Sequence, residues 1–390
     1  MSKKYYFIII ILFQSLFLCS FINICFSESF PNPKLLKGSV NFWKKIYTTI
    51  SENEGVFHDR IYPNIIYKKI YIGDKKGKFL NEFLKKSKIE IYYMLKRIKS
   101  SPEDTLSLKE LNILDQFEKF SSKDEITINH VRFQKGQKEQ FKAGIQRSGM
   151  FISKIKSIFK EYNIPERLVY LPCVESSFNQ NAKSKAGAIG LWQFMKMTGK
   201  GYLTITKEID ERYDPILSTR AAAKLLNRNY KELKSWPLAI TAYNHGLSGM
   251  KRAVKIVGTN DIGEIIEKYK GSSFKFASKN FYSSFLAASE VAMDYKKYFC
   301  NVHMEQPIYR TRINLKNINY NDACETLGIP LKTFKKYNPA LRPIFYKTKK
   351  IVPKIYSIYI PNSIAVFDDE LSANLVQKHE LIENEISWYD

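Results

Sequence analysis

The sequence has little cysteine and little histidine for its length. Its 390 residues contain five of each, and Cys19 and Cys25 lie in the apolar N-terminal stretch. The other cysteines, Cys173, Cys300 and Cys324, are widely spaced. This pattern argues against a disulfide framework and a cysteine-based metal site, and the histidines are isolated from one another. We therefore predict no metal and no other cofactor.

Acidic residues are also scarce. The chain has 38 Asp and Glu against 62 Lys and Arg, which gives a formal net charge of +24. Such a surplus attracts polyanions, whether nucleic acid, anionic lipid or a cell wall that bears peptide carboxylates. The lysines are scattered, so charge alone does not choose among these partners. Nucleic-acid binding would rest on charge alone, and we predict none.

The N-terminus combines a short basic segment with an apolar run. Residues 1–27 read MSKKYYFIIIILFQSLFLCSFINICFS, which is typical of a secretory signal peptide with cleavage after Ser27. The alternative is an uncleaved membrane anchor, because Phe7 to Phe26 is nearly long enough to span a bilayer. We predict an exported protein of the periplasm or cell envelope, either released or anchored by this segment.

Four further regions follow along the chain. Residues 28–130 are predicted to be a helical N-terminal region, with an amphipathic helix near 85–98, or alternatively a partly disordered spacer. Residues 131–303 read as a run of helices, and residues 304–362 change to extended segments around a helical pair. The acidic stretch 363–390 reads as a polar tail.

The most informative part of the chain surrounds Glu175. The apolar residues of 132–162 suit one face of a helix. A second helical run then begins near Pro165, at a favourable first-turn position. Pro172 should kink or end that run just before Glu175, leaving the acid at a helix C-terminus.

Glu175 is a lone acid, since no Asp or Glu follows it until Glu208. Glycosidic bond cleavage usually needs two carboxylates, but one suffices when an N-acetyl sugar turns its own acetamido group onto the anomeric carbon.

Four sequence blocks around this acid carry a family resemblance. They are the Glu-Ser pair of YLPCVESSFN, Ser184 within AKSKAGAIG, the segment GLWQFM and the segment AYNHG. Together they resemble the lytic transglycosylases that cleave bacterial peptidoglycan, in particular the membrane-bound D type. The resemblance implies a mainly α fold with a lysozyme-like (goose-type) helical catalytic domain at 131–303.

The resemblance also implies a mechanism. Glu175 would act as acid and then as base to cleave the MurNAc-GlcNAc β-1,4 bond without water, giving 1,6-anhydro-MurNAc ends on peptidoglycan strands. An apolar surrounding would raise its pKa, and we expect that surrounding from Phe178, Ile189, Leu191, Trp192 and Phe194. Lys183 and Lys185 should then face solvent or substrate carboxylates.

Five further residues are implied to bind substrate. Ser184 and Gln193 match positions that contact the sugar beside the acid, and their alternatives are a loop-stabilising hydroxyl and a surface amide. Tyr243 and Asn244 match cleft-lining positions, with the alternative of a helix end capped by Gly246. The family has a further tyrosine in a segment that reads KNFYSSFLAA here, so alignment places Phe281 at that position and Tyr282 one residue later.

Residues 304–362 resemble a degenerate lysin-motif module, a small strand-helix-helix-strand unit of a class that binds N-acetylglucosamine-containing glycans. The Gly-Asp pair usual near its first helix is missing.

Two other functions stay open at this point. A hydrolytic muramidase would need a second carboxylate, with Asp210, Glu211 or Asp214 nearest in sequence. The other alternative is a noncatalytic peptidoglycan-binding protein, whose enzyme domain has lost its activity.

Overall fold

The computed structural model describes residues 30–307, 310–314, 320–347, 357–361 and 384–385. The predicted signal peptide and nearly all of the predicted acidic tail lie outside these residues. By its contacts the chain divides into two units, Met1–Ala143 with Leu225–Asn301, and Gly144–Lys224 with Val302–Asp390. Each unit is described by itself below.

The first unit contains a three-stranded sheet that the sequence analysis missed. Strands β1 (Glu54–Asp59), β2 (Ile66–Tyr71) and β3 (Val131–Lys135) are antiparallel in the order β2-β1-β3. Phe57 of β1 lies opposite both Lys68 of β2 and Phe133 of β3. Strand β2 buries Tyr67 and Ile70, three positions apart, so it lacks the period-two pattern typical of a strand. Strand β3 joins the sheet from about sixty residues further along the chain.

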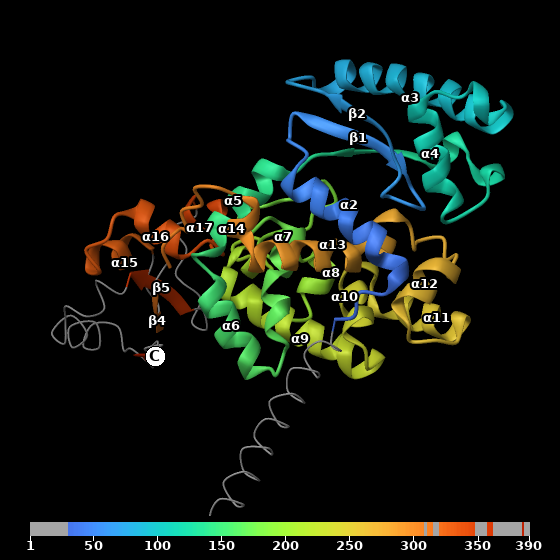
Figure 1. Ribbon diagram of the computed structural model, residues 1–390. Coiled ribbons are helices and arrows are strands. Elements are labelled where there is room, and N and C mark those ends of the chain that lie inside the picture. The colour runs from blue at the N-terminus through green and yellow to red at the C-terminus, as the bar shows by residue number, and fades with distance from the viewer. Residues whose placement is uncertain (1–29, 308–309, 315–319, 348–356, 362–383, 386–390) are drawn as a thin grey trace, which may run out of the picture. The chain divides into compact units, whose positions relative to one another are not determined.

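The predicted N-terminal helices are present beside this sheet. Helix α3 (Gly77–Ser100) contains and extends the segment predicted near 85–98, and α4 (Leu108–Glu118) follows it. Figure 1 shows α3 and α4 beside the sheet. Buried residues of α3, α4 and the sheet, such as Ile91, Ile113 and Tyr67, share one core.

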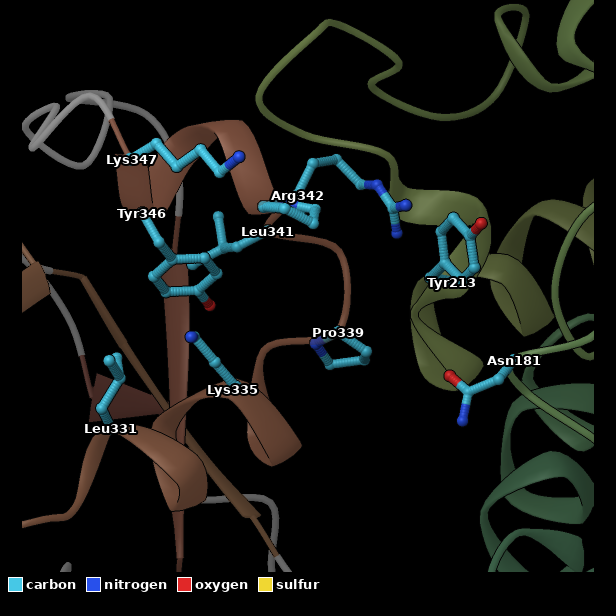
Figure 2. A pocket seen from close by; sticks show the side chains of 10 residues that line it. Asn181, Tyr213, Leu331, Lys335, Pro339, Leu341, Arg342, Tyr346 and Lys347 are labelled. Carbon is cyan, nitrogen blue, oxygen red and sulfur yellow. The ribbon is translucent and has the colours of Figure 1, made fainter.

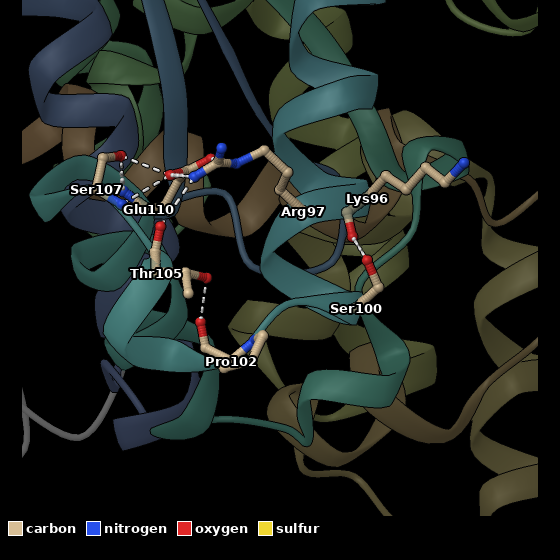
Figure 3. Close-up of polar contacts among 7 residues, drawn as sticks. All are labelled: Lys96, Arg97, Ser100, Pro102, Thr105, Ser107 and Glu110. Atoms are coloured by element: carbon tan, nitrogen blue, oxygen red, sulfur yellow. Dashed lines mark hydrogen bonds and ion pairs between the residues drawn. The ribbon is translucent and has the colours of Figure 1, made fainter.

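Helix α4 begins with a capping box. The Ser107 side chain accepts a hydrogen bond from the Glu110 backbone N–H, and the Glu110 carboxylate accepts one from the Ser107 backbone N–H. Arg97 of α3 donates from Nε to the same carboxylate at 3.0 Å, which joins the two helices (Figure 3). This single carboxylate therefore caps one helix and links it to the other.

The rest of the first unit is helical. Helix α2 (Lys37–Thr48) packs along α13 (Phe276–Met293), and Trp43 Nε1 donates to Asn280 Oδ1 at 3.2 Å. The other helices here are α10 (Trp236–His245), α11 (Leu247–Val257), α12 (Ile262–Lys268) and α14 (Tyr295–Tyr298). Helix α9 (Pro215–Leu233) belongs partly to each unit.

The segment predicted as one helix face is in fact strand β3 followed by two helices. These are α5 (Lys138–Ser148) and α6 (Ile152–Glu161), separated by a turn at Gly149. A Cβ on Gly149 would lie 2.3 Å from the Glu305 carbonyl oxygen. Position 149 requires glycine because another segment approaches its backbone too closely for a residue with a Cβ.

The second unit continues with short helices and ends in an α+β module. The helices are α7 (Leu171–Glu175), α8 (Lys196–Gly199), α15 (Tyr320–Thr326), α16 (Leu331–Tyr337) and α17 (Pro343–Lys347). Strand β4 (Arg310–Asn314) pairs antiparallel with β5 (Ser357–Pro361) and with β6 (Asn384–Glu385). The predicted order strand-helix-helix-strand is observed, with α17 and β6 added, and the mainly α prediction is confirmed. The lysin-motif assignment itself stays a prediction.

Within the part of the chain that the structure describes, no helix combines the length and the apolar character needed to cross a bilayer.

Candidate active site

Glu175 is the last residue of helix α7, as expected from the sequence. A 3-10 helix, Glu166–Tyr170, leads into α7. Pro172 lies in the first turn of α7, so it begins this helix instead of interrupting one. The absent N–H of a proline leaves no hydrogen bond unmade at that position.

The turn after Glu175 is conformationally strained. Ser177 and Phe178 both have positive φ, 51° and 55°, a region that side-chain-bearing residues rarely adopt. The Ser177 carbonyl oxygen accepts hydrogen bonds from Arg147 Nη2 at 2.7 Å and Nε at 3.1 Å. Ser176 Oγ donates to the Leu191 carbonyl oxygen at 2.8 Å. Such strain persists only where surrounding contacts enforce it, and it is often found at functional sites.

The apolar residues expected to surround the acid are all buried. Phe178, Leu191 and Trp192 are fully enclosed, and Ile189 and Phe194 are nearly so. Burial raises the pKa of Glu175 to about 8, although its side chain keeps partial exposure. A carboxyl with this pKa is mostly protonated at neutral pH, as a proton donor must be.

The lysines near this acid are arranged as predicted. Lys183 and Lys185 are exposed. Cys173, two residues before Glu175, is buried, and burial raises the pKa of its thiol. It behaves as a small apolar residue.

Ser184 and Gln193 lie in one short loop that folds back on itself. Ala188 N–H donates to Ser184 Oγ at 2.9 Å, and Gln193 Nε2 donates to the Gly190 carbonyl oxygen at 2.8 Å. Both side chains thus have a contact within the loop, which agrees with the alternative of a loop-stabilising hydroxyl for Ser184. Both are also partly exposed, and their predicted contacts to substrate stay predictions.

A buried arginine fixes this loop. Arg212 binds Asp210 through Nε at 2.9 Å and Nη2 at 2.7 Å. Its Nη1 donates to the carbonyl oxygens of Gly187 and Phe194, both at 3.2 Å. Bidentate pairing of this kind is strong and orients the guanidinium. Gly190 lies so close to Arg212 that a Cβ would be 1.9 Å from the Arg212 carbonyl oxygen.

The three carboxylates considered as a second catalytic acid all have structural partners. Asp210 is paired with Arg212. Asp214 Oδ1 accepts from the Ile216 and Leu217 backbone N–H groups at the start of α9. Glu211 Oε2 accepts from the Thr204 backbone N–H at 2.6 Å. These contacts favour a structural role for each of them.

Three of the predicted substrate-binding residues belong to the first unit. Tyr243 and Asn244 lie at the C-terminal end of α10, which Gly246 caps with a φ of 89°. Asn244 is exposed, and its Oδ1 accepts from Ser278 Oγ at 3.0 Å. Their substrate contacts stay predictions.

Tyr282 is placed differently from the expectation. Its side chain is 0% exposed and its hydroxyl donates to the Pro31 carbonyl oxygen at 2.7 Å. A side chain buried in this way does not reach a substrate, so we no longer include Tyr282 among the candidate site residues. Phe281 beside it is also buried.

Sequence reasoning missed Arg147 and Arg212. Arg147 acts on a backbone carbonyl thirty residues away, and nothing in the local sequence signals such a contact. Arg212 had a weak signal, because it lies between two acids in DERYDP. Among the residues described, no group of three or more His, Cys, Asp or Glu could hold a metal ion.

Comparison with known proteins supports the family resemblance. Residues 153–266 match the family described as "Transglycosylase SLT domain". Membrane-bound lytic murein transglycosylase D of Escherichia coli (strain K12) is 30% identical over 204 residues, which are 47% of this chain and 41% of that protein. A putative tributyltin chloride resistance protein of Alteromonas sp. (strain M-1) is 34% identical over 110 residues, 28% of this chain and 53% of that protein.

Among solved structures, an inactive mutant of lytic transglycosylase Slt from Pseudomonas aeruginosa is 13% identical, with a TM-score of 0.33 over 58% of this chain and 36% of that one. This likeness is too slight to support an argument. The chain spans about half the length or less of the curated relatives it matches. The sequence matches support the predicted resemblance: residues 153–266 of this chain match the family described as "Transglycosylase SLT domain".

Proposed function

We propose that the chain is a peptidoglycan lytic transglycosylase, which cleaves the MurNAc-GlcNAc β-1,4 bond without water and leaves 1,6-anhydro-MurNAc ends. The observation that carries this proposal is the state of Glu175. It is a carboxyl within the SLT domain, at a helix end, with a pKa raised to about 8 by burial. Such a group holds a proton at neutral pH and can donate it to a leaving oxygen.

The reaction would proceed in two steps on one carboxyl group. Glu175 first protonates the glycosidic oxygen while the muramic acetamido group attacks the anomeric carbon, so that the substrate replaces the second carboxylate. Glu175, now ionised, takes the proton of the C6 hydroxyl, and that oxygen attacks the anomeric carbon, which displaces the acetamido oxygen and closes the anhydro ring. The proton returns to Glu175 and no water is consumed.

The strained turn supports this role. Arg147 and the Ser176 hydroxyl hold the backbone directly after Glu175, so the carboxyl is positioned before substrate arrives. We propose that Ser184 and Gln193, on the loop fixed by Arg212, contact the sugar beside Glu175. The roles of Tyr243 and Asn244 follow from the resemblance only.

A hydrolytic muramidase has less support, because Asp210, Glu211 and Asp214 are each engaged in the structural contacts given above. We further propose that the protein works in the cell envelope on peptidoglycan strands, either released from the membrane or anchored to it by residues 1–27.

The test is mass spectrometry of the muropeptides that the purified chain releases from peptidoglycan. We expect products lighter by one water than hydrolytic products, and none from Glu175→Gln. The matched control is Glu166→Gln, which removes an exposed acid paired with Lys156 and should keep full activity.

A folding check belongs to the same experiment. Because the folded protein raises the pKa of Glu175 and so disfavours its charge, the neutral Gln variant should unfold at an equal or higher temperature at pH 8.

In the product assay, products with reducing ends would instead support the muramidase. No products from the parent chain would support a noncatalytic binding protein.

A further inference from the structure

A second candidate site lies in the second unit, outside the residues assigned to catalysis. It is a pocket of about 520 Å³, within the range of ligand-binding cavities. One wall comes from α16, α17 and the loop between them, and the facing wall comes from Asn181 and Tyr213 (Figure 2). Asn181 follows Glu175 by six residues, and Tyr213 follows the Arg212 clamp directly.

Backbone hydrogen bonds join the two walls. Asp210 N–H donates to the Ala340 carbonyl oxygen, and Arg342 N–H donates to the Glu208 carbonyl oxygen, both at 2.7 Å. Between them Ile209 and Leu341 form a β-bridge, and both residues belong to the core of the C-terminal module. The pocket is therefore built by paired backbone on both sides and needs no ligand to form.

A buried asparagine fixes the turn that forms the floor. Asn338 is 2% exposed, and its Nδ2 donates to the carbonyl oxygens of Phe334 and Tyr359, both at 2.9 Å. Its Oδ1 accepts from the Tyr359 N–H at 2.8 Å. Pro339, which lines the pocket, follows directly.

The charge of the pocket is of one sign. Lys335, Arg342 and Lys347 line it, and no Asp or Glu is among its lining residues. The Arg342 guanidinium lies over the Tyr213 ring at 4.1 Å, and Lys335 Nζ lies over the Tyr346 ring at 4.6 Å. Figure 2 shows Arg342 extended toward Tyr213, with Lys335 beside Tyr346. The rings hold the cations in place without neutralising them.

We propose that this pocket binds the carboxylate-bearing peptide stems of peptidoglycan. Three cations line the pocket, two of them positioned over tyrosine rings, and no acid is among the lining residues. This lining favours a ligand with more than one carboxylate, because charge-assisted hydrogen bonds to carboxylates are strong. The two tyrosine rings and the Asn181 amide offer apolar and amide contacts to a peptide chain. The pocket would select strands that still bear stems. This proposal rests on the proposed substrate of the SLT domain.

The experiment measures equilibrium binding to the full chain carrying Glu175→Gln, so that no turnover is needed. Soluble glycan fragments with peptide stems are compared with the same fragments after amidase removal of the stems, and with the free stem peptide. We expect the stem-bearing fragments to bind on the order of tenfold more tightly than the stem-free ones, and the free peptide to bind measurably.

The pocket is tested by Lys335→Gln combined with Arg342→Gln. The double variant should lose about tenfold in affinity for stem-bearing fragments and change little for stem-free glycan, in keeping with the loss of two charge-assisted contacts. The control is Lys332→Gln combined with Lys336→Gln, on exposed positions of the same helix that do not line the pocket. This control removes the same charge, and its affinity for stem-bearing fragments should stay within about twofold of the parent value, because exposed charges contribute little.

Three outcomes would overturn the proposal. They are equal binding of fragments with and without stems, equal losses in the pocket and control variants, and binding of a DNA oligonucleotide of matched charge as tight as that of the stems. Failure of the proposed catalysis has a different signature, since anhydro products would then be missing while stem-dependent binding persists.

Discussion

At the scale of single residues, the chemistry depends on where an ionisable group is placed more than on its identity. Glu166 and Glu175 lie nine residues apart, yet Glu166 is exposed and paired with Lys156, whereas burial raises the pKa of Glu175 to about 8. Desolvation disfavours the charged form of a carboxyl and so keeps the proton in place. Glu175 therefore has the property that the proposed acid step needs near neutral pH.

This difference predicts the pH dependence of the reaction. In the proposed reaction the acid step needs protonated Glu175, so kcat/KM should stay level from about pH 6 to 7 and fall about tenfold per pH unit above about 8. Measured pH profiles of anhydro product formation would check this. A fall already complete by pH 6 would mean that an ordinary, solvated carboxylate is in use.

His58 in β1 is a second buried ionisable residue. Its ring centroid lies 4.4 Å from that of Phe42 and 5.6 Å from that of Phe276. Nδ1 lies 2.8 Å from the Asp59 carbonyl oxygen, which can only accept, so Nδ1 carries the proton and Nε2 is buried. Burial, with a smaller contribution from Arg132, lowers the pKa of His58 to about 4.

The lowered pKa makes stability depend on pH. The unfolded chain binds a proton at this histidine below about pH 6.5 and the folded protein only below about 4, so folding stability is lost as pH falls between these values. We expect His58 to account for a loss of about 3 kcal/mol in the free energy of unfolding from pH 7 to 4. For His58→Phe, the free energy of unfolding measured with denaturant should fall by about 3 kcal/mol less than that of the parent protein between pH 7 and 4. Equal losses in both proteins would rule out His58 as the cause.

At the scale of elements, the loop that carries Ser184 and Gln193 is held by close backbone approach and one guanidinium. Gly187 and Gly190 both have positive φ, 86° and 81°. A Cβ on Gly187 would meet nothing within 4 Å, whereas one on Gly190 would be 1.9 Å from the Arg212 carbonyl oxygen. Both glycines thus have a left-handed backbone, but only Gly190 lacks room for a side chain.

This contrast gives a matched pair of variants. Gly187→Ala should cost about 1 kcal/mol for its left-handed backbone, and Gly190→Ala about 2 to 4 kcal/mol because the clash with Arg212 must also be relieved. Thermal unfolding would measure both. We expect activity to fall at least tenfold more in Gly190→Ala, and similar effects of the two variants would show that the approach to Arg212 does not hold the loop.

At the scale of the whole molecule, the dominant feature is a net charge of +24. Cationic surplus of this size raises association with an anionic wall and is screened by salt, since the Debye length falls to about 3 Å at 1 M. We expect binding of the Glu175→Gln variant to stem-bearing peptidoglycan to weaken about tenfold or more between 0.05 and 0.5 M salt, following the screening argument. Binding to a neutral N-acetylglucosamine oligomer should change little in the same sedimentation assay. Equal salt dependence for both ligands would show that the net charge does not drive binding to peptidoglycan.

Much of the candidate site could be predicted from local sequence. The acid at a helix end, the buried apolar residues after it and the Gly246 cap of α10 all follow from residue type and spacing. They are local because a proline, a glycine or an apolar run acts on the few residues beside it. The four blocks likewise specified the family, which the match of residues 153–266 confirms.

The tertiary structure decided what depends on distant partners. Strand β3 completes a sheet that begins some seventy residues earlier in the chain. Arg147 donates to the backbone of the turn that follows Glu175. The carbonyl oxygen of Pro31 accepts a hydrogen bond from the Tyr282 hydroxyl, which keeps that side chain buried and away from the site. The pocket near Arg342 exists because two segments pair their backbones. By itself the sequence determined the mainly helical class, the place of Glu175 at a helix end and the burial of the apolar residues after it. Only the tertiary structure decided the contacts between remote segments. Such contacts leave no local signal in the sequence, because a backbone carbonyl is the same in every residue.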